Sequence, residues 1–102
     1  MNNYIQVITT IDSEDKANEI AQHLLKKRVA SCVQIFPVNS SYWWKGKIEK
    51  AKEWVCLIKG KNFDKIEKAI KEVHSYEIPE IIEVPILRGN ADYFKWIDKE
   101  VK

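Results

Sequence analysis

The sequence is poor in residues that break regular structure. It holds three glycines and three prolines among 102 residues, without a tract of either, so a collagen-like or low-complexity chain is excluded. Its two cysteines, Cys32 and Cys56, stand in none of the spacings typical of zinc sites or redox motifs. We therefore expect both to be small buried apolar residues of a protein in a reducing compartment.

Long apolar runs and an excess of one charge are also missing. No stretch could span a bilayer, and Met1 to Tyr4 lacks the basic region of a signal peptide. The 17 basic and 15 acidic residues are interspersed, as they are from Lys65 to Glu72, and leave a net charge of +2, whereas nucleic-acid-binding proteins cluster their positive charge. The sequence predicts a cytoplasmic protein that binds neither membrane nor nucleic acid.

What is present suits a small folded unit. Hydrophobic residues make up 45% and charged residues 31% of the chain, a mixture that can build a core and stay in solution. The length predicts one domain over residues 1–102. Because so short a chain buries only a modest fraction of its surface, association with further copies would add stability.

Apolar periodicity predicts an α+β fold. β-branched apolar runs indicate strands, and apolar residues three and four apart indicate helices. Strands are expected at 4–10, at 31–36 resuming at 40–44 beyond Pro37, at 47–59 and at 80–87, and helices after Asp12 or Ser13, after Asn62 and after Gly89-Asn90. The order βαββαβ with an extra C-terminal helix is the ferredoxin-like plan, in which both inner helices cover one face of an antiparallel sheet.

The second and third strands form a hairpin that should project from the domain. Lys45-Gly46 suits its tight turn. Residues 31–44 would span roughly 45 Å as one strand, whereas a domain of this size is about 35 Å across. The hairpin carries Tyr42, Trp43, Trp44 and Trp54, which would form an exposed apolar patch unless a partner buried them. These four are predicted subunit contacts; alternatively, Pro37 folds the hairpin back onto its own core.

The hairpin register also bears on the two thiols. A two-residue turn pairs Cys56 with Ile35, and Cys32 with Lys59. Strand side chains alternate between faces, so the two thiols would lie on opposite faces and would not share a metal or a disulfide.

The sequence contains no self-contained catalytic motif. It has no Ser-His-Asp order and no glycine-rich phosphate loop, and we predict that the protein is not an enzyme. His23 and Glu19 supply two metal ligands, which do not make a site. The segment from His74 to Glu80 places an imidazole, a phenol and two carboxylates between a helix and a strand. It is either a ligand pocket or a structural junction.

Five segments together carry a resemblance to a known family. They are Val29-Ala-Ser-Cys-Val33, Ser41-Tyr-Trp-Trp-Lys-Gly-Lys-Ile48, Glu53 with Leu57-Ile-Lys59, His74-Ser-Tyr-Glu-Ile-Pro-Glu-Ile-Ile82 and Tyr93-Phe-Lys-Trp-Ile97. In order and spacing the chain resembles the CutA divalent-cation-tolerance proteins. The resemblance implies a ferredoxin-like fold and an interlocked homotrimer similar to the P-II signalling proteins. It also implies a cytoplasmic role in tolerance of, or response to, divalent cations such as copper. The alternative is a trimeric scaffold or signalling protein that binds a small molecule or partner between subunits.

The resemblance also implies a cleft between subunits. We expect Tyr76, Glu77 and Glu80 to line it, close to Lys59 and Trp96. In that position Lys59 is the nearest cation available to Glu77 or Glu80.

Copper binding in the family has been associated with a cysteine in the first strand and a histidine pair at the end of the second helix. The corresponding residues here are Thr9 and Val73-His74, so only His74 is retained as a metal ligand. The resemblance therefore implies at most weak binding of copper or another divalent cation, and no required cofactor.

Overall fold

The computed structural model describes residues 3–102. Its elements follow the predicted order: β1 (Ile5–Ile11), α1 (Glu14–Lys26), β2 (Ala30–Trp44), β3 (Lys47–Gly60), α2 (Phe63–Val73), β4 (Ile81–Pro85) and α3 (Ala91–Glu100). The strands form one sheet in the order β2-β3-β1-β4, and every neighbouring pair is antiparallel. The predicted α+β class and ferredoxin-like plan are confirmed.

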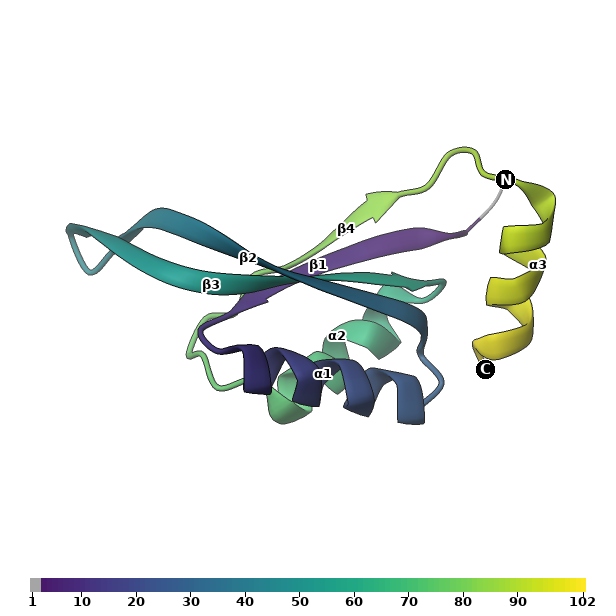
Figure 1. Ribbon diagram of the computed structural model, residues 1–102, viewed down its shortest axis with the longest axis horizontal. Coiled ribbons are helices and arrows are strands. Elements are labelled where there is room, and N and C mark those ends of the chain that lie inside the picture. Colours follow the sequence, from purple (N-terminus) through teal and green to yellow (C-terminus); the bar gives the residue numbers. More distant parts are fainter. Residues whose placement is uncertain (1–2) are drawn as a thin grey trace.

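Helices α1 and α2 cover one face of the sheet (Figure 1). Ser13 caps α1 by accepting a hydrogen bond from the Lys16 amide at 3.1 Å, and Asn62 caps α2 in the same way. The apolar stripes of both helices pack on alternate residues of β1 and β3. The fully buried side chains of this core include Val7, Ile11, Ile20, Leu24, Ile58, Ile66 and Ile70.

The hairpin of β2 and β3 projects as predicted. The domain measures 45 Å along its longest axis and 25 Å along the next, and the far half of the hairpin extends beyond the helices (Figure 1). Lys45 and Gly46 both have positive φ, 50° and 80°, as a tight two-residue turn requires. The expected pairs of Cys56 with Ile35 and of Cys32 with Lys59 are confirmed.

The predicted interruption at Pro37 is wrong. Pairing between β2 and β3 runs through Pro37, which lies opposite Trp54. The reason is that β2 is the edge strand of the sheet, where a proline can turn its missing N–H away from the neighbouring strand. The hairpin therefore stays straight and does not fold back on the core. Residues 38–53 of this hairpin are called the arm below.

The fourth strand is shorter than expected. It ends at Pro85 instead of residue 87, because β1, its neighbour in the sheet, begins at Ile5, the partner of Pro85. One further hydrogen bond joins the Ile86 amide to the Tyr4 carbonyl at 3.0 Å. The chain then leaves the sheet and enters α3.

Helix α3 stands at the end of the sheet opposite the arm (Figure 1). Phe94 stacks on Tyr4 with ring centroids 4.1 Å apart, and Asp98 accepts hydrogen bonds from the Tyr4 hydroxyl at 2.7 Å and from Lys61 at 2.8 Å. Ile97 is fully buried. These contacts hold α3 beside β1. In this position α3 leaves the second face of the sheet, the one opposite α1 and α2, largely uncovered.

That second face is apolar. Ile8 lies between Leu57 on β3 and Ile82 on β4, and Phe36 lies opposite Val55. Because side chains alternate along a strand, these residues point away from the helices. We call this surface the open sheet face; its apolar members are Ile8, Phe36, Val55, Leu57, Ile82 and Val84.

Candidate functional site

The segment between α2 and β4 is held in place by His74. This residue caps α2, with its amide donating to the Ile70 carbonyl at 2.9 Å. Its Nδ1 accepts a hydrogen bond from the Tyr76 amide at 3.1 Å, and its Nε2 lies 2.8 Å from the Thr10 carbonyl oxygen. With Nδ1 as acceptor, the ring proton sits on Nε2 and is donated to Thr10. His74 thus ties the segment to the end of β1.

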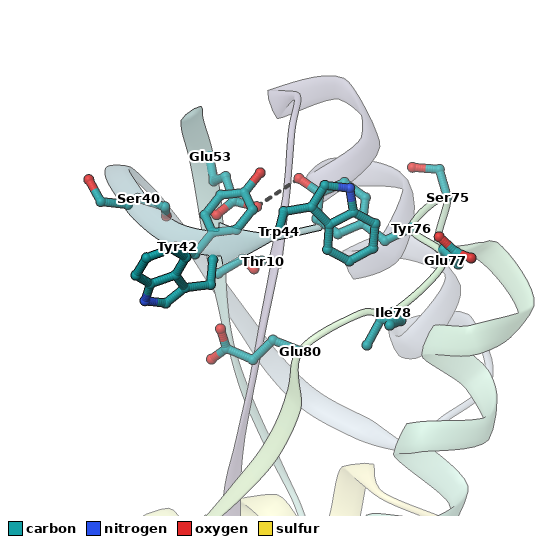
Figure 2. Close-up of a pocket in the computed structure, with 12 residues that line it drawn as sticks. Thr10, Ser40, Tyr42, Trp44, Glu53, Ser75, Tyr76, Glu77, Ile78 and Glu80 are labelled. Atoms are coloured by element: carbon teal, nitrogen blue, oxygen red, sulfur yellow. Dashed lines mark hydrogen bonds between the residues drawn. The ribbon is translucent and has the colours of Figure 1, made fainter. Parts of the chain in front are cut away.

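Tyr76 reaches from this segment to the base of the arm. Its hydroxyl donates a hydrogen bond of 2.7 Å to Glu53 Oε2, drawn as the dashed line in Figure 2. Burial of the ring, and then the hydrogen bond to Glu53, raise the pKa of Tyr76 above its ordinary value. The phenol therefore remains a proton donor at neutral pH.

Glu53 is a buried carboxylate on β3 at the base of the arm, opposite Val38. Only 6% of its surface is exposed. Its side chain lies on the same face of β3 as those of Val55 and Leu57. Among residues 3–102, the one hydrogen bond to its side chain comes from Tyr76, and no cationic side chain lies within ion-pair distance of it. The Tyr76 hydroxyl thus ties Glu53 to the segment after α2.

A cavity of about 910 Å³ opens between the arm and residues 75–80. We call it the arm pocket. Figure 2 shows its walls: Tyr42 and Trp44 come from β2, Glu53 from β3, and Tyr76, Glu77 and Glu80 from the segment after α2. The lining thus combines three carboxylates with four aromatic rings, those of Tyr42, Trp43, Trp44 and Tyr76.

Comparison with known proteins places the chain in a family. Residues 5–100 match the family model described as "CutA1 divalent ion tolerance protein". The chain belongs to the CutA1 family. It is similar to the divalent-cation tolerance protein CutA of Archaeoglobus fulgidus, with 40% identity over the full length of both chains. The resemblance inferred from the sequence is thereby confirmed.

Solved CutA structures agree with the fold. The structure described as the periplasmic divalent cation tolerance protein CutA from A. fulgidus superposes with a TM-score of 0.95 at 39% identity, covering 97% of this chain and 99% of that one. The structure of CutA1 from Pyrococcus horikoshii gives a TM-score of 0.92 at 35% identity, covering 96% and 98%. The family is named for tolerance of divalent ions and not for a reaction.

The arm pocket contains three of the five predicted CutA1 cleft residues. Tyr76, Glu77 and Glu80 line it, whereas Lys59 and Trp96 lie at the other end of the domain. Lys59 is six residues along β3 from Glu53, about 20 Å at 3.3 Å per residue, and donates a hydrogen bond to Gln34 at 3.1 Å. A second chain would have to bring Lys59 or Trp96 to this pocket.

Trp96 lies on α3 beside a smaller hollow lined also by Arg28 and Glu100. It stacks on Tyr93 with ring centroids 5.6 Å apart, and Arg28 forms an ion pair with Glu100 at 3.1 Å. Two of the charges at this hollow, those of Arg28 and Glu100, are therefore paired with each other.

The sequence did not identify Glu53 as a pocket residue. The signal that could have identified it is its spacing: Glu53 lies on the same face of its strand as Val55 and Leu57. A carboxylate among apolar side chains on one face requires a partner. Three of the four predicted subunit contacts, Tyr42, Trp43 and Trp44, also line this pocket. Trp54 instead packs against the helix-side core.

The residues considered as metal ligands are either engaged in other contacts or buried. Both ring nitrogens of His74 are engaged, so a metal would have to displace Thr10 or the Tyr76 amide. Thr9 is fully buried on the helix side of β1, and His23 contacts Glu72 at 2.8 Å. Within the described part of the chain, no three His, Cys, Asp or Glu side chains are grouped as metal ligands would be.

The helices are short. None of them, among residues 3–102, combines the length and the apolar content needed to cross a bilayer.

Proposed function

We propose that the protein acts in divalent-cation tolerance as a closed homotrimer, with no catalytic role of its own. The observation that supports the assembly is the open sheet face together with the projecting arm. Phe36, Ile82 and Val84 on this face are 41–48% exposed in one chain. At about 25 cal/mol per Å² of apolar surface removed from water, covering the face strongly favours association.

The arm adds a second reason for assembly. Trp43 is 73% exposed and Tyr42 is 42% exposed, and both lie beyond the part of the sheet that the helices cover. Edge strand β2 also presents unpaired backbone groups along its 15 residues, and such an edge is a template for pairing with another chain. A neighbouring copy can satisfy the edge and bury the aromatic rings together.

A pair of charge substitutions tests this assembly. Phe36→Glu places a carboxylate on the open sheet face and should dissociate the trimer, because the charge would have to be buried without a partner. Gln22→Glu introduces the same group on the exposed side of α1 and should leave the trimer intact. Light scattering at micromolar concentration measures both. Assembly that survives Phe36→Glu unchanged would show that the open sheet face is not the interface.

The role in cation tolerance includes, in our proposal, only weak binding of copper. Thr9 stands where the family's associated thiol would be, and His74 uses both nitrogens within the fold. Calorimetric titration with Cu²⁺ should show the same weak binding for the native protein and for His74→Ala. Tight stoichiometric binding that disappears in His74→Ala would instead establish a metal-buffering protein centred on that imidazole.

A second candidate function is a scaffold that binds a small molecule, by analogy with the P-II signalling proteins. The arm pocket favours it, because its volume of about 910 Å³ lies in the range of known ligand sites, roughly 300–1,000 Å³. Glu80→Gln separates the roles of the pocket: loss of ligand with an intact trimer indicates a binding site, and a lower melting temperature with dissociation indicates an assembly element.

We also propose a cytoplasmic location. Its support is that Cys32 and Cys56 are both free, as is usual for thiols in a reducing compartment. Fractionation of the source cells with immunodetection tests this. Recovery of the protein outside the cytoplasmic fraction, as the description of the A. fulgidus structure as periplasmic would lead one to expect, would refute it.

A further inference from the structure

We infer that Lys59 of a neighbouring copy is the counter-ion of Glu53, so that the arm end of one chain docks on the α3 end of the next. This inference deepens the proposed homotrimer and rests on it. A closed ring of three is built from heterologous contacts, in which one surface patch meets a different patch of the next copy. Each chain therefore needs two complementary patches, and the two ends of the open sheet face have that character.

The first patch is the acidic arm end. Glu53 is 6% exposed, and Tyr76 donates a hydrogen bond of 2.7 Å to its Oε2. Glu77 and Glu80 lie in the same region, and among residues 3–102 no cationic side chain forms an ion pair with any of these three carboxylates. A neighbouring copy that covers the arm also removes water from them. Because a buried charge without an opposite charge is costly, that copy must supply a cation here.

The second patch is the opposite end of the same face. Lys59 lies on β3 about 20 Å from Glu53 at 3.3 Å per residue. Its neighbour on β1 is Gln6, and it donates a hydrogen bond of 3.1 Å to Gln34. Both are neutral, and in the described part of the chain no carboxylate forms an ion pair with Lys59. The two ends of the face thus carry opposite charges, with the apolar residues between them.

Aromatic side chains at both ends support the same docking. Tyr93 and Trp96 stack on α3, which stands at the end of the sheet opposite the arm (Figure 1). Trp96 shares a hollow with Ser31, and the Ser31 hydroxyl donates to the Lys59 carbonyl oxygen at 3.4 Å, so this aromatic pair borders the second patch. Tyr42 on the arm and Trp96 on α3 are 42% and 40% exposed. Contact between the rings of the two patches would bury both.

One other lysine lies on this side of β3. Lys47 is at the tip of the arm, opposite Trp44, and like Lys59 it is an even number of residues from Glu53. Bringing Lys47 to the Glu53 of a neighbouring copy would set arm against arm and leave the apolar residues of the open sheet face in water. Bringing Lys59 there lays one face along the next and covers them, which favours Lys59.

A double-mutant cycle tests the pair. Glu53→Gln keeps the size and can still accept the Tyr76 hydrogen bond, and Lys59→Met keeps the aliphatic stem without the charge. Each single change leaves one charge buried without its partner, so each should raise the concentration at which the trimer dissociates by about 30-fold or more. The double variant removes both charges and should assemble more tightly than either single variant.

Light scattering on serial dilution measures this, at a fixed urea concentration that brings dissociation of the native trimer into range. Glu19→Gln and Lys68→Met make the same changes at exposed positions of α1 and α2, outside both patches, and should leave dissociation unchanged. Single variants that assemble like the native protein would overturn the inference. So would a double variant whose loss is the sum of the two single losses, since independent sites add.

Two further comparisons keep the outcomes separate. Should Glu53→Gln fail to fold, as judged by circular dichroism, two variants of Lys59 decide. Lys59→Arg keeps the charge and should remain trimeric, whereas Lys59→Glu sets a carboxylate against Glu53 and should dissociate the trimer; equal behaviour of the two would refute the pair. A monomeric native protein defeats the proposed trimer, and a native trimer in which Glu53 and Lys59 are uncoupled defeats this inference alone.

Discussion

Thr9→Val should stabilise the protein. Thr9 is fully buried on the helix side of β1, and within residues 3–102 its hydroxyl oxygen has no hydrogen-bond partner. A buried hydroxyl without a partner costs about 1–3 kcal/mol in protein mutational data. Valine replaces that hydroxyl by a methyl group of the same shape and keeps the β-branched side chain that suits a strand.

We expect a gain of about 1–2 kcal/mol, which corresponds to a rise in melting temperature of several degrees for a domain near 100 residues. Thermal and urea denaturation at a fixed protein concentration measure it, because assembly makes stability concentration-dependent. Thr9→Ser keeps the hydroxyl and loses the methyl, so it should destabilise by about 1 kcal/mol. Thr10→Val, one residue along on the other face of β1, is the control and should have little effect.

The reasoning would be refuted if Thr9→Val lowered the melting temperature. That result would mean that the hydroxyl is satisfied in solution, for example by a buried water. Thr9→Cys provides an independent check. A thiol is a weak hydrogen-bond donor and behaves as a small hydrophobe, so this variant should fall between the native protein and Thr9→Val.

Three other substitutions follow from the packing. Burial raises the pKa of the Cys56 thiol from its ordinary 9.0 to about 11. The stability that the buried neutral thiol contributes is therefore fully present below pH 9 and is lost between pH 9 and 11. Over that range the free energy of unfolding of the native protein should fall by roughly 2–3 kcal/mol relative to that of Cys56→Ala. Equal alkaline losses in urea titrations of the two proteins would contradict this. Gly60→Ala should lower the melting temperature, because the added Cβ would lie 2.8 Å from both the Val29 carbonyl oxygen and the end of Ile66; an unchanged melting temperature would show that the strand end can move. Tyr76→Phe removes the hydrogen bond that Tyr76 donates to the buried Glu53 side chain and should cost about 1–3 kcal/mol, measured by urea denaturation; no loss would show that solvent reaches the carboxylate.

The regular elements of the fold were predictable because each has a strong local cause. Ser13 and Asn62 cap their helices through their side chains, and the Lys45-Gly46 turn fixes the register of the hairpin as far as the pair of Cys32 with Lys59. The errors arose where a neighbouring strand decides the outcome. Pro37 is tolerated because β2 is an edge strand, and β4 is short because β1 begins at Ile5. Neither condition is visible in the local sequence.

The site was only partly predictable for the same reason. Tyr76, Glu77 and Glu80 are close in sequence and share one segment, so their common location followed from the chain itself. Glu53 joins them through the hairpin register and through a side-chain hydrogen bond that spans 23 residues of sequence. Such a contact depends on how the arm leaves the domain, which only the three-dimensional structure shows.

The molar mass of the native protein in solution tests the central claim most directly. Three chains of 12.0 kDa make an assembly of about 36 kDa, and light scattering at micromolar concentration should give that value across a tenfold dilution. Phe36→Glu should bring the mass down to that of one or two chains. A folded native protein of 12.0 kDa under these conditions would contradict the claim that the open sheet face and the arm are buried between copies.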